Sequence, residues 1–60
     1  MRTPAERIKT YRLRAAEVRT AAENMSPSVN RETMLRIARD YELMADNVAA
    51  AHNLQTKKTL

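Results

Sequence analysis

Apolar residues recur at alternating steps of three and four on both sides of a single Ser26-Pro27 pair. This heptad spacing is typical of a helix that packs one narrow face against a neighbouring helix. The first stripe contains Ile8, Tyr11, Ala15, Val18, Ala22 and Met25. The second contains Met34, Ile37, Tyr41, Met44, Val48 and Ala51. The pattern predicts an all-α fold with two amphipathic helices.

The first helix has a strong N-terminal signal. In Thr3-Pro4-Ala5-Glu6, the Thr3 hydroxyl can accept a hydrogen bond from the Glu6 amide, and Pro4 suits the first helical position. The chain has no glycine, so no residue offers an easy left-handed turn inside the helix. We therefore expect this helix over residues 4–25.

A second start signal lies at Ser26-Pro27. Proline disfavours helical geometry in the residue before it, which ends the first helix and lets the second begin. We expect the second helix over residues 27–53, and the helical pattern then fades. The predicted organisation is a hairpin domain over residues 1–53 and a flexible basic tail over residues 54–60.

A short turn between two helices forces them antiparallel, so the two stripes must face each other in an αα-hairpin. The expected register brings Tyr11 opposite Tyr41. It also predicts two ion pairs at the seam edges, Arg14 with Asp40 and Glu23 with Arg31. The predicted core seam consists of Ile8, Tyr11, Ala15, Val18, Ala22, Met34, Ile37, Tyr41, Met44 and Val48.

A hairpin of 60 residues without cysteine has a small core and no disulfide or thiolate metal site to support it. The second helix carries another stripe one residue along from the first. This stripe contains Leu35, Ala38, Ala45, Ala49 and His52. We expect it to form the interface of a homodimer, a four-helix bundle with the first helix on the outside.

The composition also argues against several classes of function. The longest apolar run, residues 48–51, is far shorter than the roughly 20 residues of a membrane span. We expect a mature cytoplasmic protein. With no cysteine and one histidine, His52, the chain lacks an evident nucleophile–base pair or metal-ligand cluster, so we expect no enzymatic activity, metal, cofactor or small-molecule substrate.

Positive charge is concentrated in the first helix of a chain whose net charge is +4. The basic side chains are Arg7, Lys9, Arg12, Arg14 and Arg19. One interpretation is a face for nucleic acid or an acidic protein. The favoured interpretation is that these side chains cover the seam edges with their aliphatic stems and pair with interspersed acids.

Part of the sequence is similar to a known set of proteins. The shared residues are Tyr11-Arg12, Arg14-Ala15, Glu17, Arg19, Ala22-Glu23, Met25, Arg31, Leu35, Ile37-Ala38, Tyr41 and Met44-Ala45. Over about residues 8–48 the chain resembles the short uncharacterised helical-hairpin proteins that are numerous in alphaproteobacteria. Those sequences usually have Asp-Pro at the turn, where this chain has Ser26-Pro27. The resemblance implies a hairpin and no assigned activity.

These observations favour a small non-enzymatic interaction protein that forms a homodimeric helical bundle and docks on another protein. The alternative is a regulator that binds RNA or DNA through the basic face of the first helix. The exposed leucines Leu13 and Leu43 lie opposite the seams and suit a protein partner better than a nucleic acid.

Overall fold

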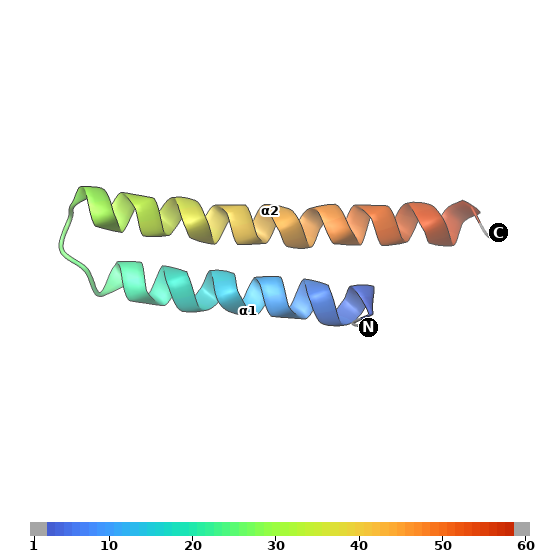
Figure 1. Cartoon of the computed structure of the whole chain (residues 1–60), viewed down its shortest axis with the longest axis horizontal. Helices are drawn as coiled ribbons and strands as arrows, with labels where there is room; N and C mark the ends of the chain where they lie inside the picture. Colours follow the sequence, from blue (N-terminus) through green and yellow to red (C-terminus); the bar gives the residue numbers. More distant parts are fainter. Residues whose placement is uncertain (1–2, 59–60) are drawn as a thin grey trace.

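The protein is an antiparallel helical hairpin in the computed structural model, which describes residues 3–58 and the side chains of residues 3–53. Helix α1 spans Pro4–Glu23 and helix α2 spans Val29–Lys58. A single turn joins them, and the molecule measures 50 × 17 × 14 Å (Figure 1). The predicted two-helix, all-α architecture is therefore confirmed.

The N-terminal end of α1 is capped as the sequence predicts. Thr3 has extended backbone angles, and its Oγ1 accepts a hydrogen bond of 3.2 Å from the Glu6 amide. Pro4 occupies the first helical position, where its missing N–H would have had no partner within the helix. Glu6 also places a negative charge in the first turn, where it interacts favourably with the positive end of the helix dipole.

The turn is longer than the sequence suggested. Helix α1 ends at Glu23 rather than residue 25, and the Asn24 side chain donates a hydrogen bond to the Thr20 carbonyl. Helix α2 begins at Val29 because Ser28, not Ser26, is its N-cap. The Ser28 Oγ accepts from the Arg31 amide at 3.2 Å, and the Ser28 carbonyl accepts from the Glu32 amide.

Arg31 ties the two helices together near the turn. Its Nε donates to the Ala22 carbonyl at 3.1 Å. Helix α1 has no basic residue in its own last turn, so Arg31 supplies the positive charge that suits the end of a helix. This contact takes the place of the predicted Arg31–Glu23 ion pair.

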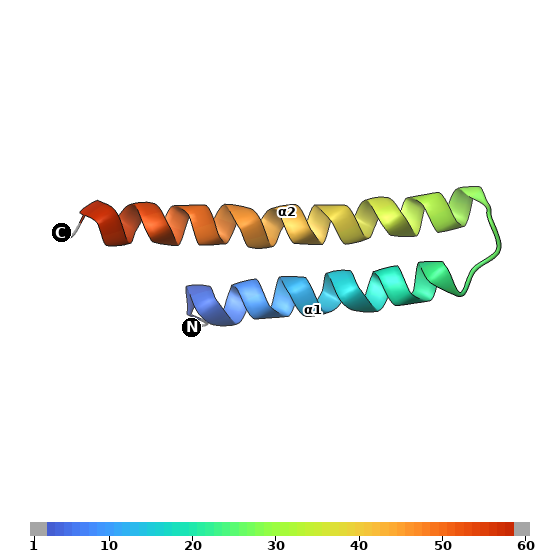
Figure 2. The ribbon, with the colours of Figure 1, turned by 180° about the vertical axis from the view of Figure 1, so that it is seen from behind.

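Helix α2 continues to Lys58, past the expected end at residue 53. Residues 54–58 contain neither proline nor glycine to end the helix, so the predicted tail is partly helical. The N-terminus of α1 lies well short of the C-terminus of α2, which projects beyond it (Figure 2). Residues 59–60 lie outside the described part of the chain.

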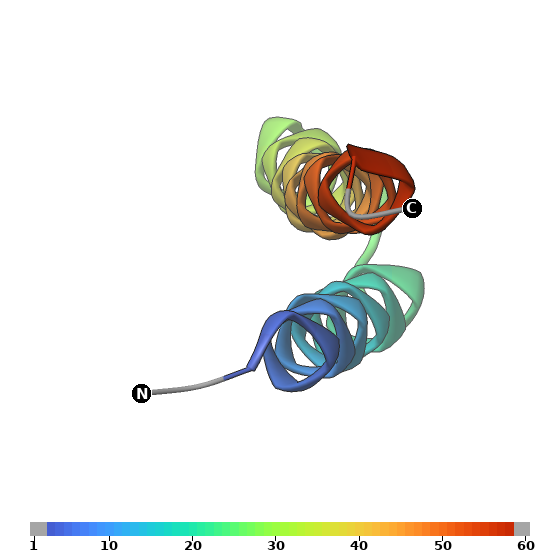
Figure 3. The ribbon, with the colours of Figure 1, turned by 90° about the vertical axis from the view of Figure 1, so that its right-hand side faces the viewer.

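Alanine side chains form the line along which the helices meet. Among the described residues, the buried ones are Ala15 and Ala22 on α1 and Ala38 and Ala45 on α2, each at most 1% exposed. The two alanines of each helix are one heptad apart. Their small size allows the two helices to run side by side in close contact (Figure 3). No large described side chain is fully buried.

The structure corrects the predicted core seam of α2. Ile37 and Met44 were expected to face α1, but they are 38% and 45% exposed. Ala38 and Ala45, expected at a dimer interface, face α1 instead. Because the apolar arc of α2 is wide, the helix can turn by about one residue and bring its alanines to the point of closest approach. The remaining seam residues are buried or half-buried, namely Ile8, Tyr11, Ala15, Val18, Ala22, Met34, Tyr41 and Val48.

Replacing a seam alanine by leucine should destabilise the hairpin. Ala15→Leu adds bulk where the helices touch, and we expect it to lower the free energy of unfolding by about 1–3 kcal/mol. Ala16→Leu is the matched control, because Ala16 is exposed. It should change stability by no more than about 0.5 kcal/mol. Urea unfolding at one protein concentration measures both, and equal stability of the two variants would contradict the alanine seam.

Candidate interaction surface

The line of buried alanines divides the hairpin into two edges with different chemistry. At 100° per residue, the residues three positions after and four positions before an alanine lie on one side of it, and those three before and four after lie on the other. On α1, Tyr11 and Val18 therefore lie on one side of Ala15, and Arg12 and Arg19 lie on the other. The same geometry on α2 separates Tyr41 from Glu42.

One edge is closed by ion pairs between the helices. Arg12 Nη2 lies 3.5 Å from Asp46 Oδ1, and Arg19 pairs with Glu42. Arg19 and Glu42 are both half-buried, so the aliphatic stem of the arginine covers the seam as its head pairs. We call this side the charged edge. Arginines of α1 were expected to pair with Glu6, Glu17, Glu23 and Asp40. The acids that pair are instead Asp46 and Glu42 of α2.

The opposite side is apolar, and we call it the open edge. Tyr11 and Tyr41 stack here with ring centroids 6.3 Å apart, which confirms their predicted contact. Every other member of this edge is half-buried or exposed. The open edge consists of Tyr11, Val18, Met34, Ile37, Tyr41, Met44 and Val48. Ile37, Tyr41 and Met44 line a surface hollow of about 220 Å³ together with Asp40.

The five basic residues predicted to share one face are distributed around α1. Arg12 and Arg19 belong to the charged edge and have acidic partners. Arg7 and Arg14 directly precede seam residues, which places them beside the open edge, whereas Lys9 lies on the other side of the helix. Among the described residues, Arg14 and Asp40 form no ion pair, either with each other or with another group.

The stripe predicted as a dimer interface is largely used within the hairpin. Ala38 and Ala45 are buried against α1, and Leu35 and Ala49 are half-buried. Only His52 of this stripe is exposed. The physical reason is the rotation of α2 described above, which moves the exposed apolar surface to the open edge.

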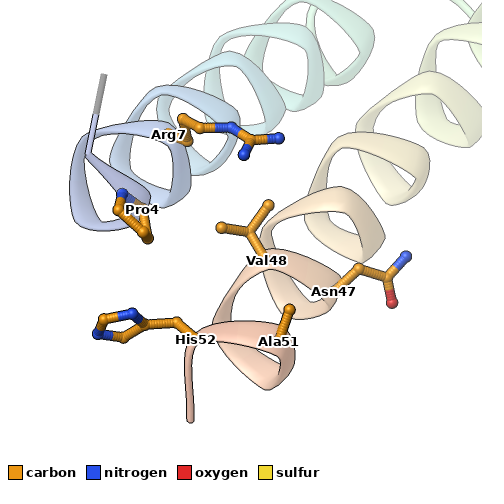
Figure 4. Close-up of a pocket in the computed structure, with 6 residues that line it drawn as sticks. All are labelled: Pro4, Arg7, Asn47, Val48, Ala51 and His52. Carbon is orange, nitrogen blue, oxygen red and sulfur yellow. The ribbon is translucent and has the colours of Figure 1, made fainter. Parts of the chain in front are cut away.

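His52 lies in a second hollow at the end of the hairpin opposite the turn. This hollow has a volume of about 270 Å³ and is lined by Pro4, Arg7, Asn47, Val48, Ala51 and His52. Val48 extends toward α1, the His52 ring lies beside Pro4, and the Asn47 amide points away (Figure 4). The hollow combines apolar walls with one charged rim residue, Arg7.

Among the residues whose side chains are described, three large and exposed apolar ones lie away from both edges. Leu13 and Leu43 are 57% and 58% exposed, and Val29 is also exposed at the start of α2. The sequence singled out the two leucines but not Val29. Val29 follows Ser28 directly and belongs to neither heptad stripe, so hydrophobic periodicity could not identify it.

Neither a metal cluster nor a membrane span is found in the described residues. Their histidine and acidic side chains form no group of three or more that could hold a metal ion. No described helix has the length and apolar character needed to cross a bilayer. No protein-family model, curated protein or solved structure matches the chain.

The pairing of Arg19 with Glu42 should be measurable as a coupling energy. A double-mutant cycle with Arg19→Gln and Glu42→Gln should give about 0.2–1 kcal/mol, the usual range for a partly exposed pair, and the value should fall in 1 M salt. A control cycle replaces Glu42→Gln by Glu32→Gln, since Glu32 is exposed on α2. Thermal unfolding measures both cycles. Equal coupling in the two would argue against the pair.

Proposed function

We propose that this chain is a small non-enzymatic interaction protein that acts as a homodimeric four-helix bundle and docks on another protein. The observation that carries the proposal is the open edge. Among residues 3–53 of the isolated hairpin, only alanines are fully buried, while a row of large apolar side chains on both helices stays accessible. Contiguous exposed apolar surface of this kind is typical of an interaction site.

Energetics favour covering the open edge. Fully burying an exposed isoleucine or methionine contributes about 1.5–3 kcal/mol. Ile37 and Met44, which are 38% and 45% exposed, would gain a fraction of that, and a dimer would gain it in both copies. A chain of 60 residues buries a smaller fraction of its surface than a larger domain, so this additional burial matters for its stability. When a second hairpin packs on the open edge, the four helices would enclose one larger core between the two hairpins.

The partner-binding part of the proposal uses the surfaces that such a dimer leaves free. Leu13 and Leu43 point away from the open edge and remain exposed when that edge is covered. Ala16 is exposed about one turn from Leu13, and Ala50 is exposed two turns from Leu43 along the same helix face. Such patches suit contact with an apolar surface on another protein.

Nucleic-acid binding is the second candidate. It is favoured by the net charge of +4 and by Arg7, Lys9 and Arg14, which have no acidic partner among the described residues. It is disfavoured by the division of the basic residues between two edges and by the pairing of Arg12 and Arg19. The tyrosines stack on each other at the open edge, which leaves bases no free aromatic platform on the basic side.

Sedimentation equilibrium with two adjacent substitutions tests the dimer. We expect the wild-type chain to be a dimer at micromolar concentration. Met44→Lys should raise the dimer dissociation constant at least about tenfold, or 1.4 kcal/mol, because it places an unpaired charge in the buried interface. Leu43→Lys is the matched control and should leave the constant unchanged. A well-folded wild-type monomer, or equal effects of both substitutions, would contradict the proposal.

Capture from cell extract distinguishes the two candidate functions. If the chain docks on a protein, the immobilised wild-type chain should retain that protein after nuclease treatment, and the Leu13→Ser/Leu43→Ser variant should not retain it. The nucleic-acid candidate expects the opposite result. Nuclease treatment would then abolish retention, and retention would fall steeply with salt. Lys9→Gln/Arg14→Gln would weaken retention and make it less dependent on salt, because each substitution removes a possible phosphate contact. Circular dichroism of each variant checks that the helices are intact.

A further inference from the structure

We infer that the occupant of the open edge is a second copy of this chain, placed with both turns at the same end of the bundle and held in that arrangement by Arg14 of each copy against Asp40 of the other. This inference rests on the proposed dimer and adds its topology. The observation that carries it is the unequal charge on the two borders of the open edge.

The border of the open edge on α1 is positive. Arg7 and Arg14 are exposed, lie one heptad apart and directly precede the seam residues Ile8 and Ala15. The border on α2 is negative, because Asp40 lines the hollow formed by Ile37, Tyr41 and Met44. Within one chain these borders lie on different helices and form no ion pair.

A symmetric dimer can place one open edge on another in two ways. If the two-fold axis runs along the helices, the turns lie at the same end, and α1 of each copy faces α2 of the other. The positive border of each copy then meets the negative border of its partner. If the axis runs across the helices, the turns lie at opposite ends and α1 faces α1, so that positive borders face each other.

The heights of the charges along the bundle also fit the first arrangement. Tyr11 and Tyr41 stack and therefore lie at one level. Arg14 lies three residues closer to the turn than Tyr11, and Asp40 lies one residue closer than Tyr41. At a rise of 1.5 Å per residue, the two levels differ by only about 3 Å. An axis along the helices preserves these levels, so Arg14 reaches Asp40 of the other copy without a change of register.

The crossed arrangement brings like charges together. With its axis near the Tyr11–Tyr41 level, Arg7 of one copy would face Arg14 of the other at heights that differ by about 1.5 Å. Like charges in direct opposition penalise the wrong arrangement and so determine how two surfaces pair. Apolar contact alone would not distinguish the two arrangements, since the open edge is apolar along its length.

Charge reversal in mixed dimers tests the inference. Arg14→Glu and Asp40→Arg should each weaken the homodimer at least about tenfold, because both contacts across the interface become repulsive. An equimolar mixture should form a heterodimer with the wild-type dissociation constant, since every contact is then attractive. Lys9→Glu, at an exposed position on the other side of α1, makes the same change in charge as Arg14→Glu and should have little effect. Analytical ultracentrifugation with one labelled chain measures each constant.

A distance measurement gives an independent readout. The chain has no cysteine, so Ser26→Cys in the turn supplies one labelling site per copy. With turns at the same end, the two thiols should cross-link readily and paired spin labels should lie close together. With turns at opposite ends, the labels would be at least about 30 Å apart, the length of a 20-residue helix.

The outcomes separate the two proposals. A wild-type dimer whose mixed variants show no recovery, or whose labels lie far apart, would overturn this topology and leave the proposed dimer standing. A wild-type monomer would overturn both. Three results together would support both proposals: loss of the dimer with Met44→Lys, recovery of the dimer in the mixture of Arg14→Glu with Asp40→Arg, and cross-linking at the turn.

Discussion

The close approach of two helices along four alanines is the constraint on which the rest of the structure depends. Small side chains at heptad spacing bring the helix backbones together, but they also bury little apolar area. The larger side chains are consequently displaced to the two sides of the contact. Each side then takes its own character, and the arginines of α1 close one side while aromatic and aliphatic residues occupy the other.

Much of this architecture could be predicted from the sequence, because its strongest signals are local. Thr3 and Pro4 determine where α1 begins, and the Ser26-Pro27 pair requires a break between two heptad stripes. The Tyr11–Tyr41 contact followed from these stripes and an antiparallel turn. Residues 26–28 were harder to interpret, since Ser26 and Ser28 are both competent N-caps and only the backbone conformation of the turn decides between them.

The rotation of α2 about its own axis could not be predicted in the same way. Its apolar arc includes two adjacent stripes, and hydrophobic periodicity gives nearly equal weight to a seam centred on Ile37 and one centred on Ala38. The alanines pack more closely, and turning them inward also carries Glu42 and Asp46 toward Arg19 and Arg12. The close approach of the backbones and the pairing of charges therefore favour the same rotation. Hydrophobic periodicity measures neither of them.

In the proposed dimer, this rotation would make the unpaired charges matter more for assembly than the paired ones. Arg12 and Arg19 are satisfied within the chain, so they offer little net attraction to a partner. Arg14 and Asp40 border apolar surface and have no ion-pair partner among the described residues. Covering that surface would remove water from around them, and a charge left there without a partner would be costly, so the arrangement that pairs the two charges would be favoured over one that does not. In the proposed dimer, the ion-paired edge would stay within each hairpin, and the opposite charges on the two borders of the open edge would orient the second copy.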